Sequence, residues 1–97
     1  MAIEFRDAWL EAFYEHDASH RRLPEAIRPA LFRKLQILDA ATQESDLTVP
    51  PGNRFEYLKG KLAGWCSIRV NQQYRLIFRW SDQTAWETYL DAHTYQG

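Results

Sequence analysis

Residues 64–80 read GWCSIRVNQQYRLIFRW, and this stretch decides the fold. Two apolar runs flank a polar triplet at 71–73, which is typical of two antiparallel strands joined by a short turn. Side chains alternate across a strand, so each run has one apolar face and one face that carries arginine. The apolar faces coincide only if Arg69 lies opposite Arg75, because a slip of one residue would bury charge. The sequence therefore predicts this register.

The strand pattern continues on both sides of the hairpin. Further strands are predicted at 54–59 and 84–90, with a short opening strand at 2–6. If the last turn spans 81–83, Arg75 lies opposite Tyr89 and Ile77 lies opposite Glu87. The face that carries the arginines would then hold a mixture of charged and aromatic groups, which are Arg69, Arg75, Arg79, Glu87, Tyr89 and Asp91.

The first half of the chain has helical periodicity. Asp7 is a plausible N-cap for a helix over 8–16. Pro24 suits the first turn of a second helix over 24–41, whose start we expect Pro29 to displace. One apolar stripe follows this second helix, formed by Ile27, Leu31, Leu35 and Leu38. The prediction is a single α+β domain over 1–97, with two N-terminal helices packed on a mainly antiparallel sheet of four to five strands.

Composition excludes several classes of protein. Of 97 residues, 45% are hydrophobic, which is enough to build a core, and a net charge of −1 counts against a simple nucleic-acid binder. The one cysteine, Cys66, allows no intrachain disulfide and is expected to be a small core residue, which fits a reducing cytosol. No apolar stretch approaches the roughly 20 residues of a membrane span. His16 and His20 have the spacing of metal ligands on a helix but lack a third ligand, so neither a metal nor a cofactor is expected.

The face that carries the arginines has two interpretations at this stage. Arg69 directly opposite Arg75 is unfavourable unless something anionic compensates. An RNA phosphate is one candidate, and internal pairing with Glu87 and Asp91 is the other. The chain end is equally open. Asp91, His93 and Tyr95 could supply acid–base chemistry beside the arginines, or they could form a solvent-facing polar tail.

Three segments resemble a known family when they are taken in order. Residues 51–60 (PGNRFEYLKG), the hairpin at 64–78 and the terminal triplet 91–93 are similar to HigB-type toxins of the RelE/ParE superfamily, as is the segment 38–47. The resemblance covers roughly 24–93. It implies a compact RelE-like fold and a cytoplasmic, ribosome-dependent endoribonuclease that cleaves messenger RNA without metal. It also implies neutralisation by a HigA-like helix-turn-helix antitoxin.

The resemblance also assigns roles to individual residues. Lys59, Arg69 and Arg75 would hold the phosphate, and Asp91 and His93 would supply acid–base or positioning functions. Glu56 stands where some relatives place a catalytic histidine and could act as the base.

Ala92 replaces the tyrosine of the family's terminal motif, so Tyr89 or Tyr95 could take over stacking on a base, and Arg79 joins the RNA-binding candidates. Two other functions stay open. One is a non-enzymatic inhibitor of a protein target such as gyrase. The other is a weakly active or inactive relative that acts mainly by binding its antitoxin.

Overall fold

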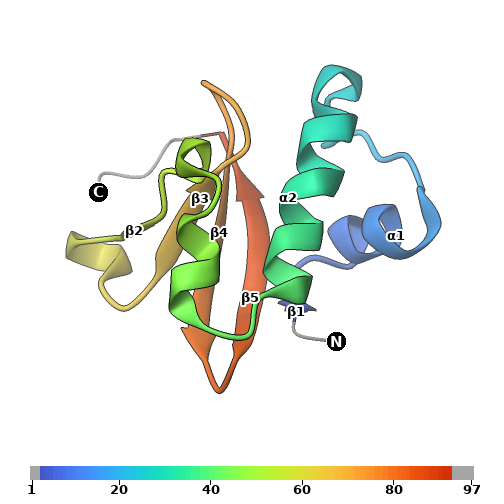
Figure 1. Ribbon diagram of the computed structural model, residues 1–97. Helices are drawn as coiled ribbons and strands as arrows, with labels where there is room; N and C mark the ends of the chain where they lie inside the picture. Colours follow the sequence, from blue (N-terminus) through green and yellow to red (C-terminus); the bar gives the residue numbers. More distant parts are fainter. Residues whose placement is uncertain (1–2, 93–97) are drawn as a thin grey trace.

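A computed structural model describes residues 3–92 of the chain. Its five strands form one sheet in the order β1-β5-β4-β3-β2 (Figure 1). The strands are β1 (Ile3–Phe5), β2 (Glu56–Tyr57), β3 (Cys66–Arg69), β4 (Arg75–Ser81) and β5 (Thr84–Asp91). β1 pairs with β5 in parallel, and the other neighbours are antiparallel. The α+β class is confirmed, with a mixed sheet of five strands.

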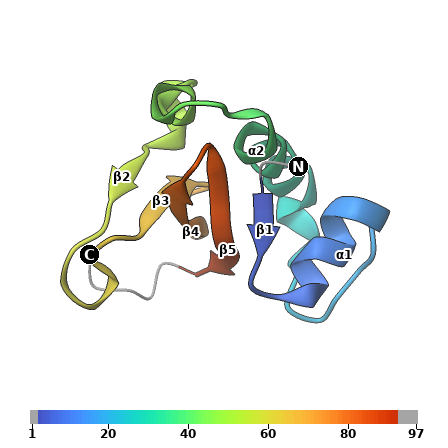
Figure 2. The ribbon, with the colours of Figure 1, turned by 90° about the horizontal axis from the view of Figure 1, so that it is seen from below.

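Two helices precede the long strands of the sheet. α1 (Ala8–His16) has the predicted bounds. α2 (Arg28–Ala40) begins four residues later than predicted, after a 3-10 turn over Glu25–Ile27. Pro29 is near the start of α2, where its missing amide costs no helical hydrogen bond. α2 runs beside β5, and α1 lies on the β1 side of the molecule (Figure 2).

The hydrophobic core joins both helices to one face of the sheet. Leu31, Leu35 and Leu38 of α2 are wholly buried in the same cluster as Ile68, Leu76 and Phe78. Leu10 and Phe13 of α1 belong to it as well. Burial of each such side chain stabilises the fold by roughly 1.5–3 kcal/mol. The apolar face that alternation creates on β3 and β4 therefore packs toward the helices. We call the opposite side of the sheet the open face.

The predicted register of the central hairpin is confirmed, and the predicted register of the last hairpin is wrong. Arg69 lies opposite Arg75 as predicted. On β5, however, Arg75 faces Asp91 and Ile77 faces Tyr89, which displaces the strand by two residues. The predicted turn at 81–83 is instead a two-residue turn at Asp82 and Gln83, both with positive φ. Such a turn matches the twist of the paired strands better than a three-residue connection.

A β-bulge restores the faces of the last hairpin. Pairing shifts by one residue between Ile77 and Arg79, and Glu87 takes up the shift with φ of 53°. Without this extra residue, the two-residue turn would place Tyr89 and its neighbours on the wrong side of the sheet. Sequence patterning did not identify the bulge because Glu87 is not glycine, the residue that usually accepts a positive φ.

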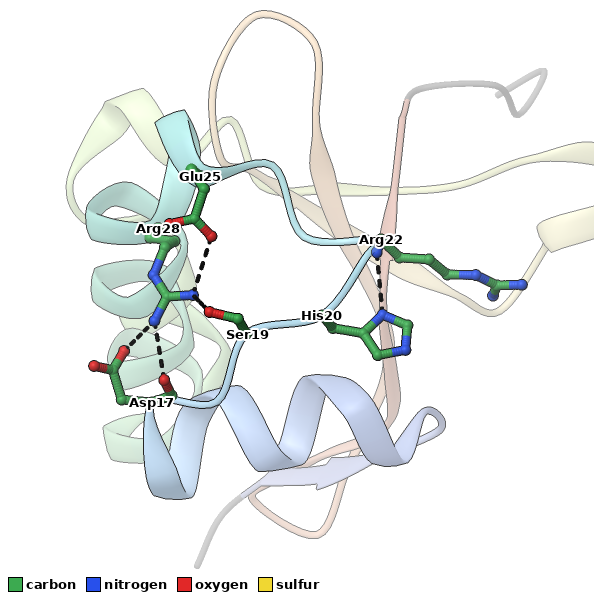
Figure 3. A network of polar contacts seen from close by, with 6 residues as sticks. All are labelled: Asp17, Ser19, His20, Arg22, Glu25 and Arg28. Atoms are coloured by element: carbon green, nitrogen blue, oxygen red, sulfur yellow. Dashed lines mark hydrogen bonds and ion pairs between the residues drawn. The ribbon is translucent and has the colours of Figure 1, made fainter.

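The polar connection between the helices is fastened by Arg28 (Figure 3). Its guanidinium donates to the carbonyl of Asp17 at 3.0 Å and to the hydroxyl of Ser19 at 3.2 Å, and it pairs with the carboxylates of Asp17 and Glu25. His20 accepts a hydrogen bond from the amide of Arg22 and stacks on Trp9. This network ties the end of α1 to the start of α2.

The two histidines with metal-ligand spacing are separated by the end of the first helix. His16 is the last residue of α1, whereas His20 lies in the connection that follows. Within residues 3–92, no group of three or more histidine, cysteine or acidic side chains could hold a metal ion. The same residues include no helix that is long and apolar enough to cross a membrane.

Candidate functional site

The open face is organised by residues that lie directly opposite one another across the strands. Arg69, Arg75 and Asp91 form one such line, which we call the charged rung. Two residues further along the strands, a second line crosses four strands, and we call it the mixed rung. It consists of Glu56, Ser67, Ile77 and Tyr89. Directly opposed residues share a face, so seven side chains from β2 to β5 meet here.

Arg75 is the centre of this arrangement and is held by neutral acceptors. Its Nε donates to the hydroxyl of Ser67 at 2.9 Å, and its Nη2 donates to the carbonyl of Arg54 at 2.7 Å. The residue is only 6% exposed. Ser67 and Ile77 lie on the adjoining rung and are wholly buried as well. This part of the face is therefore covered by neighbouring groups. Two uncharged oxygens therefore orient the guanidinium.

The main chain around Arg54 is shaped to meet this guanidinium. Residues Pro51–Asn53 form a 3-10 turn, and Arg54 follows it in the left-handed region with φ of 47°. The buried Asn53 side chain donates to the carbonyls of Leu47 and Val49, which fixes the turn from inside. The predicted strand at 54–59 is reduced by this turn to the two residues of β2.

Arg69 and Asp91 flank Arg75 on the charged rung. Arg69 is half-buried, and its Nε donates to the carbonyl of Asn71 at 3.1 Å. Arg69 and Arg75 are thus directly paired across β3 and β4, and each guanidinium is oriented by an uncharged oxygen. Asp91 lies on the far side of Arg75 and is half-buried as well. A like-charged pair of this kind is unfavourable without nearby anions, and the carboxylates of Asp91 and Glu56 lie on either side of Arg75.

Glu56 supplies a carboxylate on the other side of Arg75. Its Oε1 lies 3.8 Å from Nη2 of Arg75, an ion-pair distance that is longer than a hydrogen bond. Glu56 and Lys59 also line a hollow of about 200 Å³ together with Tyr57 and Leu58. The exposed Lys59 therefore lies along the same edge as Glu56, and both groups are open to solvent.

Tyr89 and Arg79 lie at the other end of the open face. Burial raises the pKa of the Tyr89 phenol, while Arg6 above the ring opposes that shift. Tyr89 is therefore neutral near pH 7 and is suited to packing or to donating a hydrogen bond. Arg79 is exposed and pairs with Glu87 at 3.7 Å. It lies away from the charged rung, beside Trp65.

The structure thus brings together most of the predicted site, which is Glu56, Lys59, Arg69, Arg75 and Asp91, with Tyr89 on the adjoining rung. His93 and Tyr95 lie outside the described residues. Sequence reasoning missed Ser67, whose signal was a polar residue on the same alternation as Arg69. It also missed the carbonyl of Arg54, for which main-chain geometry leaves no signal in the sequence.

Comparisons with known proteins match this chain over nearly its whole length. Residues 3–93 match the family described as the RelE-like toxin of type II toxin–antitoxin system HigB. The chain is 67% identical over 95 residues to Toxin HigB-1 of Vibrio cholerae serotype O1, covering 98% of this chain and 100% of that protein. It is 40% identical over 91 residues to an uncharacterised protein of Haemophilus influenzae, covering 94% and 90% of the two chains.

Proposed function

This chain belongs to the HigB family of RelE-like toxins of type II toxin–antitoxin systems, and we propose that it cleaves messenger RNA on the ribosome by acid–base chemistry at the charged rung. One observation carries the proposal. Arg75 is nearly buried and is oriented by the Ser67 hydroxyl and the Arg54 carbonyl, with Arg69 opposite it. A fixed pair of guanidiniums that neutral groups orient is suited to a phosphate whose charge increases during reaction.

Cleavage of RNA in this site needs no group beyond the chain and its substrate. A base removes the proton of a ribose 2′-hydroxyl, and the oxygen attacks the adjacent phosphorus. The bond to the 5′-oxygen of the next nucleotide breaks, and an acid donates a proton to that oxygen. The products are a 2′,3′-cyclic phosphate and a 5′-hydroxyl. Arg75 and Arg69 stabilise the pentavalent phosphate between these steps because hydrogen bonds to it strengthen as its charge develops.

Carboxylates on both sides of Arg75 are available for the acid–base steps. Glu56 is solvent-accessible and lies within 4 Å of the guanidinium, so it can approach a hydroxyl of a substrate whose phosphate is bound there. Asp91 lies on the other side of Arg75, and His93 is our candidate for the proton donor to the leaving oxygen. Lys59, beside Glu56, would contact a neighbouring phosphate.

The partners follow from this activity. A ribosome would supply the messenger RNA in an extended form and much of the affinity, which accounts for an RNA cleaver with a net charge of −1. Such a protein would act in the cytoplasm. A HigA-like helix-turn-helix antitoxin would hold the toxin inactive until it is removed.

The test is primer extension on a defined messenger RNA in a purified translation system, with and without ribosomes. We expect cuts only when ribosomes are present. Arg75→Ala should lower the cleavage rate by roughly 10²- to 10³-fold, the usual loss for a group that stabilises developing charge. His93→Ala and Glu56→Gln should each lower it by roughly 10²-fold or more. Arg33→Ala, which removes an exposed arginine from α2, serves as the matched control and should cleave normally.

Two outcomes would contradict the proposal. Growth arrest with intact messenger RNA and DNA-damage signalling would indicate a protein target such as gyrase. Tight binding to the antitoxin without arrest or cleavage would indicate an inactive relative whose role is control of its own operon.

A further inference from the structure

Four side chains form a continuous row across the open face, and the mechanism above uses none of their contacts. The guanidinium carbon of Arg6 lies 3.5 Å from the centroid of the Tyr89 ring. That ring meets Trp65 edge-on, with centroids 5.9 Å apart. The guanidinium carbon of Arg79 lies 4.7 Å from the centroid of the Trp65 ring. Cation and ring therefore alternate from Arg6 through Tyr89 and Trp65 to Arg79, and we call these residues the stacking row.

The stacking row adjoins the charged rung. Tyr89 lies opposite Ile77 on the mixed rung, two residues along β5 from Asp91, which is one step of about 7 Å along a strand. Trp65 precedes β3 and covers the same face. A nucleotide next to a phosphate on Arg69 and Arg75 would therefore have its base within reach of these rings.

The outer members of the row face solvent. The side chains of Arg6 and Arg79 are 50% and 53% exposed, and each pairs with an exposed or half-exposed carboxylate, that of Asp7 or Glu87. Both rings are half-buried, so part of each remains open. Exposed ion pairs of this kind are weak and are easily exchanged for a phosphate or a base.

The chemistry of the row matches the bases of single-stranded RNA. Unpaired bases stack on aromatic rings and on the planes of guanidinium groups, and these surfaces tolerate different sequences because every base has a π-face. The row itself consists of two rings and two planar cations in alternation. The alternation also neutralises phosphate charge beside each stacked base.

We propose that the stacking row binds the bases that flank the scissile phosphate, with Trp65 and Arg6 as RNA-binding residues in addition to Tyr89 and Arg79. The inference rests on the proposed function, because it assigns the substrate's bases to a surface beside the cleavage site. The row acts on binding and on the choice of sequence, whereas Arg75 acts on the chemical step.

The test compares an intact trinucleotide with one that lacks its central base. Both carry 2′-O-methyl groups, so neither can be cleaved, and their binding to the free protein is measured by fluorescence anisotropy of a label. We expect the wild type to bind the intact trinucleotide roughly 5- to 100-fold more tightly than the abasic one, the range for one stacked base. Trp65→Ala should reduce this ratio to about one, and Arg6→Ala should reduce it several-fold.

Matched variants separate stacking from folding. Trp65→Phe keeps a ring and should retain most of the ratio, and urea unfolding establishes that each variant is folded. Phe32→Ala removes a ring that is 40% exposed on α2, away from the open face, and should leave the ratio unchanged. The inference is overturned if the wild type binds the two trinucleotides equally or binds neither. It is also overturned if folded Trp65→Ala keeps the full ratio.

The outcome is independent of the cleavage assay. A base-dependent ratio without ribosomal cleavage would retain the stacking row and refute the nuclease. Cleavage by a wild type that shows no such ratio would retain the nuclease and refute the row.

Discussion

Alternate residues of the same strands build two different faces of one sheet. On the helix side, Ile68, Leu76 and Phe78 are wholly buried in the core cluster to which both helices contribute. On the open face, Ser67 and Ile77 are equally buried, but this face also carries the nearly buried Arg75, which donates to Ser67, and contacts between rings and guanidiniums. One face thus packs apolar side chains, and the other carries individual polar and cation–ring contacts.

The difference teaches where this small protein can place chemistry. A face packed against a helix must be apolar throughout, because an unpaired polar group there costs several kcal/mol. A face covered by side chains can hold a nearly buried arginine, provided that each donor finds an acceptor. The helix side therefore carries stability, and the open face carries charge at fixed positions near the surface. The following experiments test this division.

The largest effect is expected from a truncation on the helix side. Phe78→Ala should lower the free energy of unfolding by roughly 3–5 kcal/mol, because it removes a wholly buried ring from the core. The neighbouring change Arg79→Ala, on the open face of the same strand, should cost less than about 0.5 kcal/mol. Urea unfolding measures both. Equal losses for the two variants would mean that the open face contributes as much packing as the helix side.

A smaller effect is expected from a polar contact on the open face. Ser67→Ala removes the acceptor of Nε of the buried Arg75, so it should cost roughly 1–3 kcal/mol of stability. It should also slow ribosome-dependent cleavage, because Arg75 loses one of the two groups that orient it. Ser81→Ala, a control at an exposed position of β4, should change neither quantity. Normal cleavage by Ser67→Ala would show that the Arg54 carbonyl alone positions the guanidinium.

The helix side was predictable from the sequence to a large extent. Hydrophobic alternation in 65–70 and 74–80 fixed the central register, and helical spacing placed Leu31, Leu35 and Leu38 in the core. The last hairpin was not predictable in the same way. Its displacement by two residues depends on a turn at Asp82 and Gln83 and on Glu87, all non-glycine residues with positive φ. Patterning by face is unchanged by a shift of two residues, so it could not detect the error.

The candidate site also has features that the sequence could predict and features that it could not. Alternation placed Arg69, Arg75 and Tyr89 on one face, and the family resemblance added Glu56 and Lys59. Neither of them could predict the burial of Arg75, which depends on the main-chain carbonyl of Arg54 in a left-handed turn. Contacts between rings and guanidiniums, such as Arg6 on Tyr89, join segments far apart in the sequence and leave no periodic signal.

Alkaline pH should weaken the helix side through Cys66. Burial raises the pKa of its thiol from 9.0 to about 11. A raised pKa in the folded state means that the stabilising effect is complete below about pH 9 and is lost as the pH rises through 11, because the unfolded chain ionises first. The free energy of unfolding should therefore fall between pH 9 and 11, and more steeply than in Cys66→Ala, which lacks the thiol.

Alkylation provides an independent check on the Cys66 prediction. Iodoacetamide should modify the folded protein at pH 8 at least about 100-fold more slowly than the urea-unfolded chain, because the buried thiol is almost wholly protonated. Rapid alkylation of the folded protein, or parallel pH profiles for wild type and Cys66→Ala, would show that the thiol is not enclosed in the core.

The smallest expected effect concerns the bulge that aligns the two faces. Glu87 holds φ of 53°, a conformation that costs a residue with a side chain roughly 1–2 kcal/mol and costs glycine little. Glu87→Gly loses a weak surface ion pair with Arg79, and glycine raises the entropy of the unfolded chain, which opposes folding. The balance should raise the free energy of unfolding by up to about 1 kcal/mol. Glu87→Gln keeps the side chain without its charge and should change stability by less than about 0.5 kcal/mol. A clear destabilisation by both changes would mean that the ion pair, rather than the backbone, holds the bulge that brings Asp91 opposite Arg75.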